Sequence, residues 1–264
     1  TFLKSDAARG VRLQLDYLKP EMSMRDAGIE ATIVVFGSTR IPEPESARQR
    51  VTALEHRLDE NPQDKTLTAE LSVARSLLQK SRYYAVANEF AGLVGAAGAG
   101  PEDSRLVVMT GGGPGIMEAA NRGASTAGAK TIGLNISLPH EQFPNPYVTP
   151  ELCFQFHYFA LRKLHFMLRA RALVAFPGGY GTLDELFETL TLIQTRKIRP
   201  LPVVLVGREF WRRAVDMDFL VAEGVIDPED RELFWYAETA REIWDGLQLW
   251  YRRAGEELHS RPRD

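Results

Sequence analysis

The sequence predicts an α/β fold in which a doubly wound parallel sheet is covered by helices on both faces. Short apolar runs rich in strand-forming residues recur along the chain, and segments with helical spacing of apolar residues separate them. The runs are continuous rather than alternating, as expected for strands whose two faces are both buried. With 264 residues and 44% apolar content, the chain can bury a substantial core.

Five strands and five sheet-covering helices follow from these patterns. The strands are expected at residues 32–36, 106–109, 131–136, 172–176 and 201–206. The helices are expected at residues 83–98, 158–171, 183–193, 209–223 and 240–254. A helix between successive strands is the pattern that gives a parallel sheet.

One Rossmann-like nucleotide-binding domain is expected over residues 31–254, because no linker divides this stretch. Residues 1–30 predict an N-terminal helix or arm, and residues 255–264 a polar tail. Residues 42–79 carry two helical apolar stripes separated by Asn-Pro, which predicts a helical hairpin inserted after the first strand. A lid, a partner surface and an oligomer contact are all compatible with this hairpin.

Residues 177–185 read PGGYGTLDE and connect a predicted strand to a predicted helix. In parallel α/β sheets, ligands bind where a strand ends and a helix begins, because the helix N-terminus offers unpaired N–H groups to an anion. Gly178, Gly179 and Gly181 let the main chain approach a phosphate closely. With Thr182, they predict a phosphate-binding loop.

The carboxylates of this segment have two interpretations. Thr182 and Glu185 have the spacing of a capping box at a helix start. Alternatively, the apolar stripe beginning at Leu183 points Asp184, Glu185 and Glu188 away from the core and toward the site. Three acids beside a bound phosphate would repel it, which favours a chemical role for at least one of them.

A second glycine loop follows the strand at residues 106–109 and reads TGGGPG. Gly112, Gly113 and Gly115 are its candidate phosphate contacts. The loop differs from the dinucleotide fingerprint because Ile116 occupies the third glycine position, and the chain contains no Gly-Lys-Ser or Gly-Lys-Thr of a Walker loop. Two glycine loops that end separate strands and open helices support a phosphate site more strongly than one.

Two further segments supply candidate contacts. Ser38 and Arg40 follow the strand at residues 32–36, where they form either part of a nucleotide site or an ordinary turn. The helix at 158–171 is expected to bury its apolar residues, which leaves a polar stripe on the opposite face: Tyr158, Arg162, His165 and Arg169. A positive row suits a phosphate-bearing substrate, although such stripes are commonly solvated. His165 is either a general acid or a surface residue.

Composition excludes several classes of protein. A net charge of −3 gives no general attraction to nucleic acid polymers or anionic membranes. The single cysteine, Cys153, excludes an intrachain disulfide framework and suits a reducing compartment. The sequence lacks a signal pattern and a membrane-spanning apolar run, so we expect a cytoplasmic protein. We expect neither a metal nor an organic cofactor.

Three segments together resemble the LOG (LONELY GUY) family, long mislabelled as lysine decarboxylases. Residues 177–185 resemble its PGGxGTxxE signature, residues 110–118 its second glycine loop, and residues 158–163 the segment with its Arg-Lys pair. They stand in the family's order, and the likeness runs from about residue 31 to 207. It implies a phosphoribohydrolase, which cleaves a nucleoside 5′-monophosphate, such as AMP or a cytokinin riboside monophosphate, to free base and ribose 5-phosphate.

The resemblance also implies roles for individual residues. It singles out Arg162 as catalytic and places Lys163 among the phosphate contacts. Hydrolysis of an N-glycosidic bond passes through an oxocarbenium-like state, which a carboxylate stabilises or supplies with activated water, and we assign this role to Glu185. Arg162 would orient the carboxylate or assist the departing base, while the glycines, Ser38 and Thr182 would hold the substrate. The family's habit implies a homodimer or higher oligomer.

Two other functions compete with this one. A non-catalytic protein that binds a nucleotide or carries the molybdenum cofactor would need similar glycine loops, but it would not need Arg162 together with Glu185. A decarboxylase that uses pyridoxal phosphate requires a Schiff-base lysine, and neither glycine motif contains one. The arginine and the carboxylate therefore favour the hydrolase. The preferred base and the physiological role are not readable from the sequence.

Overall fold

In the computed structural model, which describes residues 2, 5–100, 103–137 and 143–259, seven strands form one parallel sheet. Its order is β4-β3-β2-β1-β5-β6-β7. The strands are β1 (Ala31–Phe36), β2 (Leu106–Thr110), β3 (Thr131–Ile136), β4 (Cys153–Phe156), β5 (Ala170–Ala175), β6 (Val203–Val206) and β7 (Phe234–Ala237). This confirms the doubly wound α/β fold. Strands β4 and β7 were not predicted, because they are four-residue edge strands too short for a clear apolar run.

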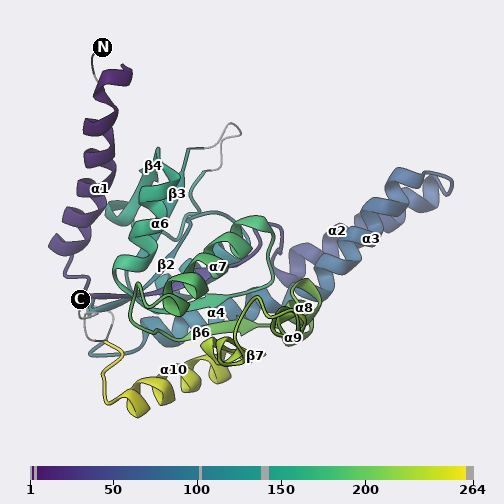
Figure 1. The fold of residues 1–264 in the computed structure, drawn as a ribbon. Coiled ribbons are helices and arrows are strands. Elements are labelled where there is room, and N and C mark those ends of the chain that lie inside the picture. Colours follow the sequence, from purple (N-terminus) through teal and green to yellow (C-terminus); the bar gives the residue numbers. More distant parts are fainter. Residues whose placement is uncertain (1, 3–4, 101–102, 138–142, 260–264) are drawn as a thin grey trace.

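Helices cover both faces of the sheet (Figure 1). One face packs against α4 (Arg82–Gly95), α5 (Ile116–Thr126) and α10 (Ala240–Ala254). The other packs against α1 (Arg9–Asp26), α6 (Phe159–Leu168), α7 (Tyr180–Gln194) and α8 (Arg208–Ala214), with α9 (Met217–Ala222) beyond. Along β1, Ile33 and Val35 contribute to the first core and Val34 to the second. Because successive side chains alternate across the sheet, a continuous apolar strand supplies both layers.

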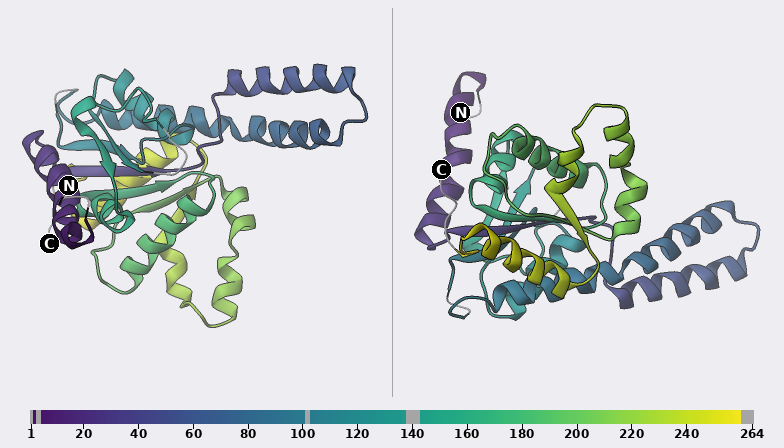
Figure 2. Two further views of the ribbon diagram at one scale, coloured as in Figure 1. Left: turned by 90° about the horizontal axis from the view of Figure 1, so that it is seen from above. Right: turned by 60° about the horizontal axis from the view of Figure 1, so that its bottom comes forward.

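The expected hairpin follows β1 and consists of α2 (Pro44–Glu60) and α3 (Lys65–Lys80). It extends away from the sheet as a long antiparallel pair (Figure 2). Its inner face buries a small core of its own: Val51, Leu54, Leu67, Leu71 and Ala74. The Asp64 carboxylate caps α3 by accepting hydrogen bonds from the Thr66 and Leu67 amides, at 2.8 and 3.0 Å. The hairpin is therefore internally stabilised.

Helix α1 covers the expected N-terminal segment and lies against α6. The Asp16 carboxylate accepts hydrogen bonds from the His157 and Tyr158 amides at the start of α6, at 2.8 and 3.0 Å. At the other end of α6, Arg169 donates two 2.7 Å hydrogen bonds to the Glu21 carboxylate. Polar contacts thus fix α1 across the length of α6. The expected polar tail extends beyond the described residues.

The order of the strands reverses direction between β1 and β5. From β1 the chain builds the sheet outward through β2, β3 and β4 on one side and later through β5, β6 and β7 on the other. The loops after β1, β2 and β5 therefore meet at the carboxyl edge of the sheet. Crevices at such reversal points are where open α/β sheets bind ligands.

Helices α4 and α5 pack so closely that one glycine controls their separation. A Cβ placed on Gly123 of α5 would collide with the Asn88 carbonyl of α4. We expect Gly123→Ala to lower the free energy of unfolding by about 1–3 kcal/mol, the usual cost of overpacking, measurable by urea denaturation. Gly10→Ala in exposed α1 is the control and should be neutral or stabilising, since no described atom lies within 4 Å of its Cβ. Equal effects would contradict the packing argument.

Candidate active site

Three loops converge where the strand order reverses, and backbone hydrogen bonds join them. The Ser38 amide donates to the Pro177 carbonyl at 3.0 Å, and the Ile116 amide donates to the Ser38 carbonyl at 3.2 Å. The Phe176 amide also donates to the Phe36 carbonyl at 2.8 Å. The loop after β1 is thus the bridge between the two glycine loops. Its Ser38 hydroxyl accepts a 3.1 Å hydrogen bond from the Arg40 amide, which closes a local turn.

The glycine loop after β2 needs glycine for steric reasons. Gly112 and Gly115 have φ of +73° and +70°, in the left-handed region that favours glycine. A Cβ on Gly115 would also collide with the backbone of Ser38 and Thr39. Gly115 therefore allows the loops after β1 and β2 to touch, whereas a Cβ on Gly112 would meet the side chain of Asn135.

A network of buried side-chain hydrogen bonds holds this glycine loop in place. Asn145 donates to the carbonyls of Gly112 and Gly113, each at 3.1 Å, and to Asn121 Oδ1 at 2.9 Å. The Thr110 hydroxyl donates to Asn121 Oδ1 at 2.7 Å and accepts from the Gly112 amide at 2.9 Å. Because these groups satisfy one another, the network fixes the loop. Local sequence patterns do not predict this network, since Asn145 lies 33 residues after Gly112.

Helix α7 begins at Tyr180, three residues before the expected start. Its N-cap is Gly179, which has no side chain, so the capping-box interpretation of Thr182 and Glu185 is wrong. The Thr182 side chain is buried instead against Gly178, where a Cβ would collide with it. Among the described residues, no atom lies within 4 Å of a Cβ on Gly179 or Gly181. The helix N-terminus therefore opens onto free space, as an anion site requires.

Glu185 is buried, with 7% of its surface exposed, although the apolar stripe of α7 predicted that it would point away from the core. The prediction was wrong because Leu183 and Phe187 are only half-buried, and the buried face includes Thr182, Glu185 and Leu186. Burial raises the pKa of Glu185 to about 7. The charges of Lys163 and Arg162 oppose this rise, whereas the neighbouring acids of α7 reinforce it.

The polar stripe of α6 was expected either to be solvated or to face a phosphate-bearing substrate. Arg162 turns inward: its Nε donates to the Leu134 carbonyl at 2.7 Å, and its guanidinium carbon lies 5.2 Å from the centroid of the Phe166 ring. A Cβ on Gly111 would lie 2.6 Å from Arg162 Nη2, so the glycine makes room for the guanidinium. Burial lowers the pKa of Arg162, and the charge of Glu185 counteracts it. The structure thus brings Arg162 to the glycine loop.

Lys163 reaches α7 rather than open solvent. Its Nζ lies 2.9 Å from Asp184 Oδ1 and 2.7 Å from Glu188 Oε2. Hydrogen bonds to these carboxylates raise the pKa of Lys163 against the opposing effect of burial. Two carboxylates already engage its charge, so its predicted phosphate contact stays a prediction.

The other two basic residues of the predicted polar stripe, His165 and Arg169, contact α1. His165 is buried under α1, where its Nε2 lies 3.1 Å from the Tyr17 carbonyl oxygen and its ring packs between Tyr17 and Phe156. Burial lowers its pKa. The interpretation of His165 as a surface residue is therefore wrong, and its role as a general acid stays a prediction. Arg169 is likewise engaged, by Glu21.

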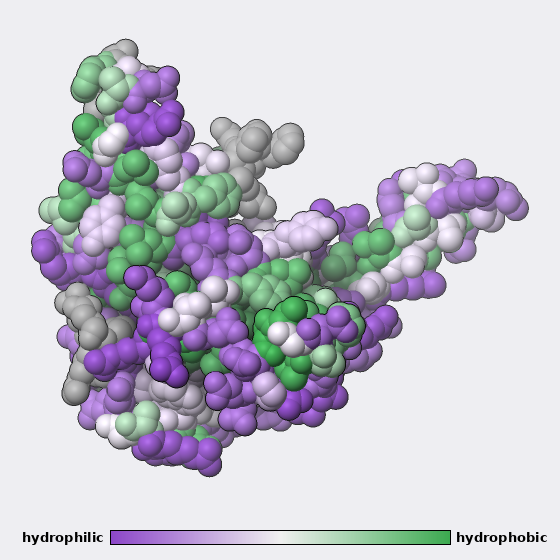
Figure 3. Space-filling model, viewed as in Figure 1, coloured by the Kyte–Doolittle hydropathy of each residue, from purple (hydrophilic) through white to green (hydrophobic). Residues whose placement is uncertain are grey.

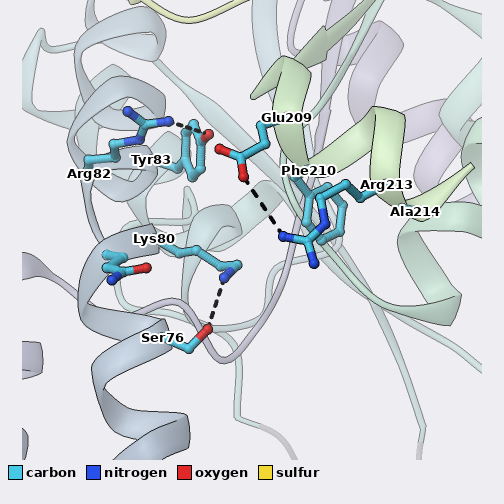
Figure 4. Close-up of a pocket in the computed structure, with 9 residues that line it drawn as sticks. Ser76, Lys80, Arg82, Tyr83, Glu209, Phe210, Arg213 and Ala214 are labelled. Atoms are coloured by element: carbon cyan, nitrogen blue, oxygen red, sulfur yellow. Dashed lines mark hydrogen bonds and ion pairs between the residues drawn. The ribbon is translucent and has the colours of Figure 1, made fainter.

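A groove of about 770 Å³ opens beside the base of the hairpin (Figure 4). Side chains of α3, the start of α4 and α8 line it. Lys80 donates to the Ser76 hydroxyl at 2.9 Å, and Arg82 donates to the Tyr83 hydroxyl at 2.7 Å. None of the predicted site residues is among its described lining residues. Across the described part of the chain, no group of three or more His, Cys, Asp or Glu side chains could hold a metal ion.

Comparison with known proteins supports the relationship seen in the motifs. A family model described as "Possible lysine decarboxylase" matches residues 117–247. Curated relatives include the probable cytokinin riboside 5'-monophosphate phosphoribohydrolase LOGL3 of Oryza sativa subsp. japonica, which is 37% identical over 89 residues, covering 33% of this chain and 42% of LOGL3. The chain is similar to the LOG family over this region. The matched region contains Arg162 and Glu185, whereas the glycine loop after β2 lies before it.

Other LOG relatives match a longer part of the chain. The phosphoribohydrolase LOG of Oryza sativa subsp. japonica is 32% identical over 141 residues, which cover 52% of this chain and 57% of that protein. The chain therefore spans about half the length of the curated LOG proteins it matches. A solved structure, TM1055, overlaps 83% of this chain at 19% identity and a TM-score of 0.49. Among the described helices, none has the length and apolar character needed to cross a membrane.

The burial of Glu185 predicts a pH-dependent stability. Its pKa of about 7 lies above the ordinary value of 4.5, so the folded protein holds this proton more tightly, and stability is lost as pH rises through this window. We expect Glu185→Gln to unfold at a higher temperature than wild type at pH 8 and near the wild-type temperature at pH 4.5. The difference should approach roughly 3 kcal/mol above pH 7.

The control is Glu209→Gln, which replaces an exposed carboxylate of α8. Calorimetric melting of both variants from pH 4.5 to 8 gives the comparison. A Glu185→Gln difference that does not change with pH would show that Glu185 ionises in the folded protein as easily as in the unfolded chain.

Proposed function

We propose that the protein is a nucleoside 5′-monophosphate phosphoribohydrolase that hydrolyses the N-glycosidic bond of AMP or a cytokinin riboside monophosphate. The products would be the free base and ribose 5-phosphate. The observation that carries the proposal is the buried Glu185, electrostatically coupled to Arg162 beside a glycine loop. The curated relatives are named cytokinin riboside 5'-monophosphate phosphoribohydrolases, which supports the same reaction.

The glycine loops and the N-terminus of α7 would bind the 5′-phosphate. The open space at Gly179 and Gly181 leaves this helix end accessible, and its N–H groups favour an anion. In the same turn, the Thr182 side chain packs against Gly178. Binding energy at the phosphate would then align the sugar with the reacting groups.

Glu185 would act at the sugar carbon. As the bond to the base breaks, positive charge develops on the ribose, and an ionised Glu185 would stabilise this charge or activate the attacking water. A pKa of about 7 suits proton transfer near neutral pH. Arg162, held by the Leu134 carbonyl, would orient the carboxylate or assist the departing base.

The alternative is a protein that binds a nucleotide or the molybdenum cofactor without catalysis. Such a protein would use the same loops for phosphate. It would gain nothing from Glu185, whose ionisation is opposed by burial and by two neighbouring acids. The buried carboxylate is therefore the feature that favours the hydrolase.

The assay incubates the protein with AMP, GMP, CMP and isopentenyladenosine monophosphate and measures free base by chromatography. We expect base release with kcat/KM rising through about pH 7, as Glu185 ionises. Glu185→Gln should lower kcat at least about 100-fold, the lower end for loss of a general acid or base. Glu209→Gln, an exposed matched control, should retain wild-type activity. If every nucleotide survived while one raised the melting temperature, the binding protein would be favoured.

The expected homodimer has a candidate surface on α1 and α6. Val11, Leu15, Leu18 and Met22 are 43–53% exposed, and their spacing of four, three and four residues places them on one stripe of α1. Apolar side chains are visible along α1 in Figure 3. On the adjacent α6, Phe159, Leu164 and Leu168 are also exposed. We propose that a second copy of the chain covers this face, since contiguous apolar patches mark interaction sites.

Replacing two residues of the stripe tests the dimer. Leu15→Glu with Leu18→Glu should halve the molar mass measured by light scattering, because burying two carboxylates in an apolar contact is costly. Val73→Glu is the control, since Val73 is 59% exposed on the hairpin. An unchanged mass in the α1 variant would place the subunit contact elsewhere or show a monomer.

A further inference from the structure

Lys163 joins the two helices that carry Arg162 and Glu185. It follows Arg162 directly on α6, and its ammonium lies between Asp184 and Glu188 of α7, at 2.9 and 2.7 Å. These acids are four positions apart and therefore lie on one face of α7. Glu185 lies between them in sequence. The Lys163 side chain is 19% exposed, whereas its partners Asp184 and Glu188 are 58% and 35% exposed.

The charges around Glu185 depend on this lysine. The acids Asp184 and Glu188 on α7 oppose ionisation of Glu185, whereas Lys163 and Arg162 on α6 favour it. Of the two cations, Lys163 has the larger effect on the pKa of Glu185. Without Lys163, three acids of α7 would face Arg162 alone. Like charges within one turn also destabilise the helix.

We propose that Lys163 is a positioning residue that binds Asp184 and Glu188 together, and so holds Arg162 beside Glu185 and allows Glu185 to ionise. This differs from a direct phosphate contact, because the charge of Lys163 acts through the carboxylates of α7. Its catalytic consequence rests on the proposed phosphoribohydrolase function. Its electrostatic consequence for Glu185 does not.

The kinetic test compares Lys163→Met with Lys163→Arg over pH 5.5 to 9. In Lys163→Met, the acidic limb of kcat/KM should move to higher pH, with a loss of at least about tenfold at pH 6.5, since one pKa unit changes the ionised fraction about tenfold. Activity should recover partly at pH 9, and Lys163→Arg should restore the wild-type limb. A raised KM with an unmoved limb would identify a phosphate ligand and overturn the proposal.

A titration separates this proposal from the proposed function. Carbon-13 NMR of carboxyl-labelled protein follows Glu185, assigned by the signal that Glu185→Gln removes. Lys163→Met should raise the titration midpoint, whereas Asp184→Asn and Glu188→Gln should lower it. If the midpoints move this way but no nucleotide is hydrolysed, the phosphoribohydrolase function fails and the electrostatic role of Lys163 stands. An unmoved midpoint in Lys163→Met, or in both acid variants, contradicts the proposal whatever the activity.

Discussion

The hydrogen bond from the Ser38 amide to the Pro177 carbonyl fixes the point on which the rest of the site depends. It joins the loops after β1 and β5, the two strands between which the sheet reverses its order. Helix α7 starts three residues after Pro177, so this junction lies next to its N-terminus. Farther along the helix, Glu185 is buried and interacts with the charges of Lys163 and Arg162 on α6.

The geometry of the site also explains why polar residues of α6 face inward and apolar ones face outward. Arg162 and Lys163 must face the glycine loop and α7, since they carry the charges that oppose the three acids of α7. With its polar residues inward, α6 leaves Leu164 and Leu168 outside. An exposed apolar face is unfavourable in water, and a second copy of the chain would cover it together with the stripe on α1. The proposed site and the proposed dimer surface are thus two sides of one helix.

The strands and glycine loops could be predicted because each is a local pattern: a continuous apolar run followed by glycines. The inward orientation of Arg162 on α6 and of Glu185 on α7 could not be predicted. A prediction from apolar periodicity assumes that polar residues face solvent. That assumption fails for Glu185 at the candidate site and for His165 under α1. The buried amide of Asn145 shows a different limit, since a contact between distant loops leaves no periodic signal. The errors in side-chain orientation therefore arise where contacts between elements override local rules.

The position of Glu185 along α7 separates its charge from that of a bound phosphate. A phosphate at the N-terminus of α7 would raise the pKa of a nearby carboxylate further, so the two anions must not be adjacent. Glu185 lies five residues after Tyr180, about 8 Å along the helix axis at 1.5 Å per residue. A sugar fits between anions at this separation. The helix would then hold the phosphate at its positive end and present the carboxylate one and a half turns later, where the glycosidic bond of a nucleoside monophosphate would lie.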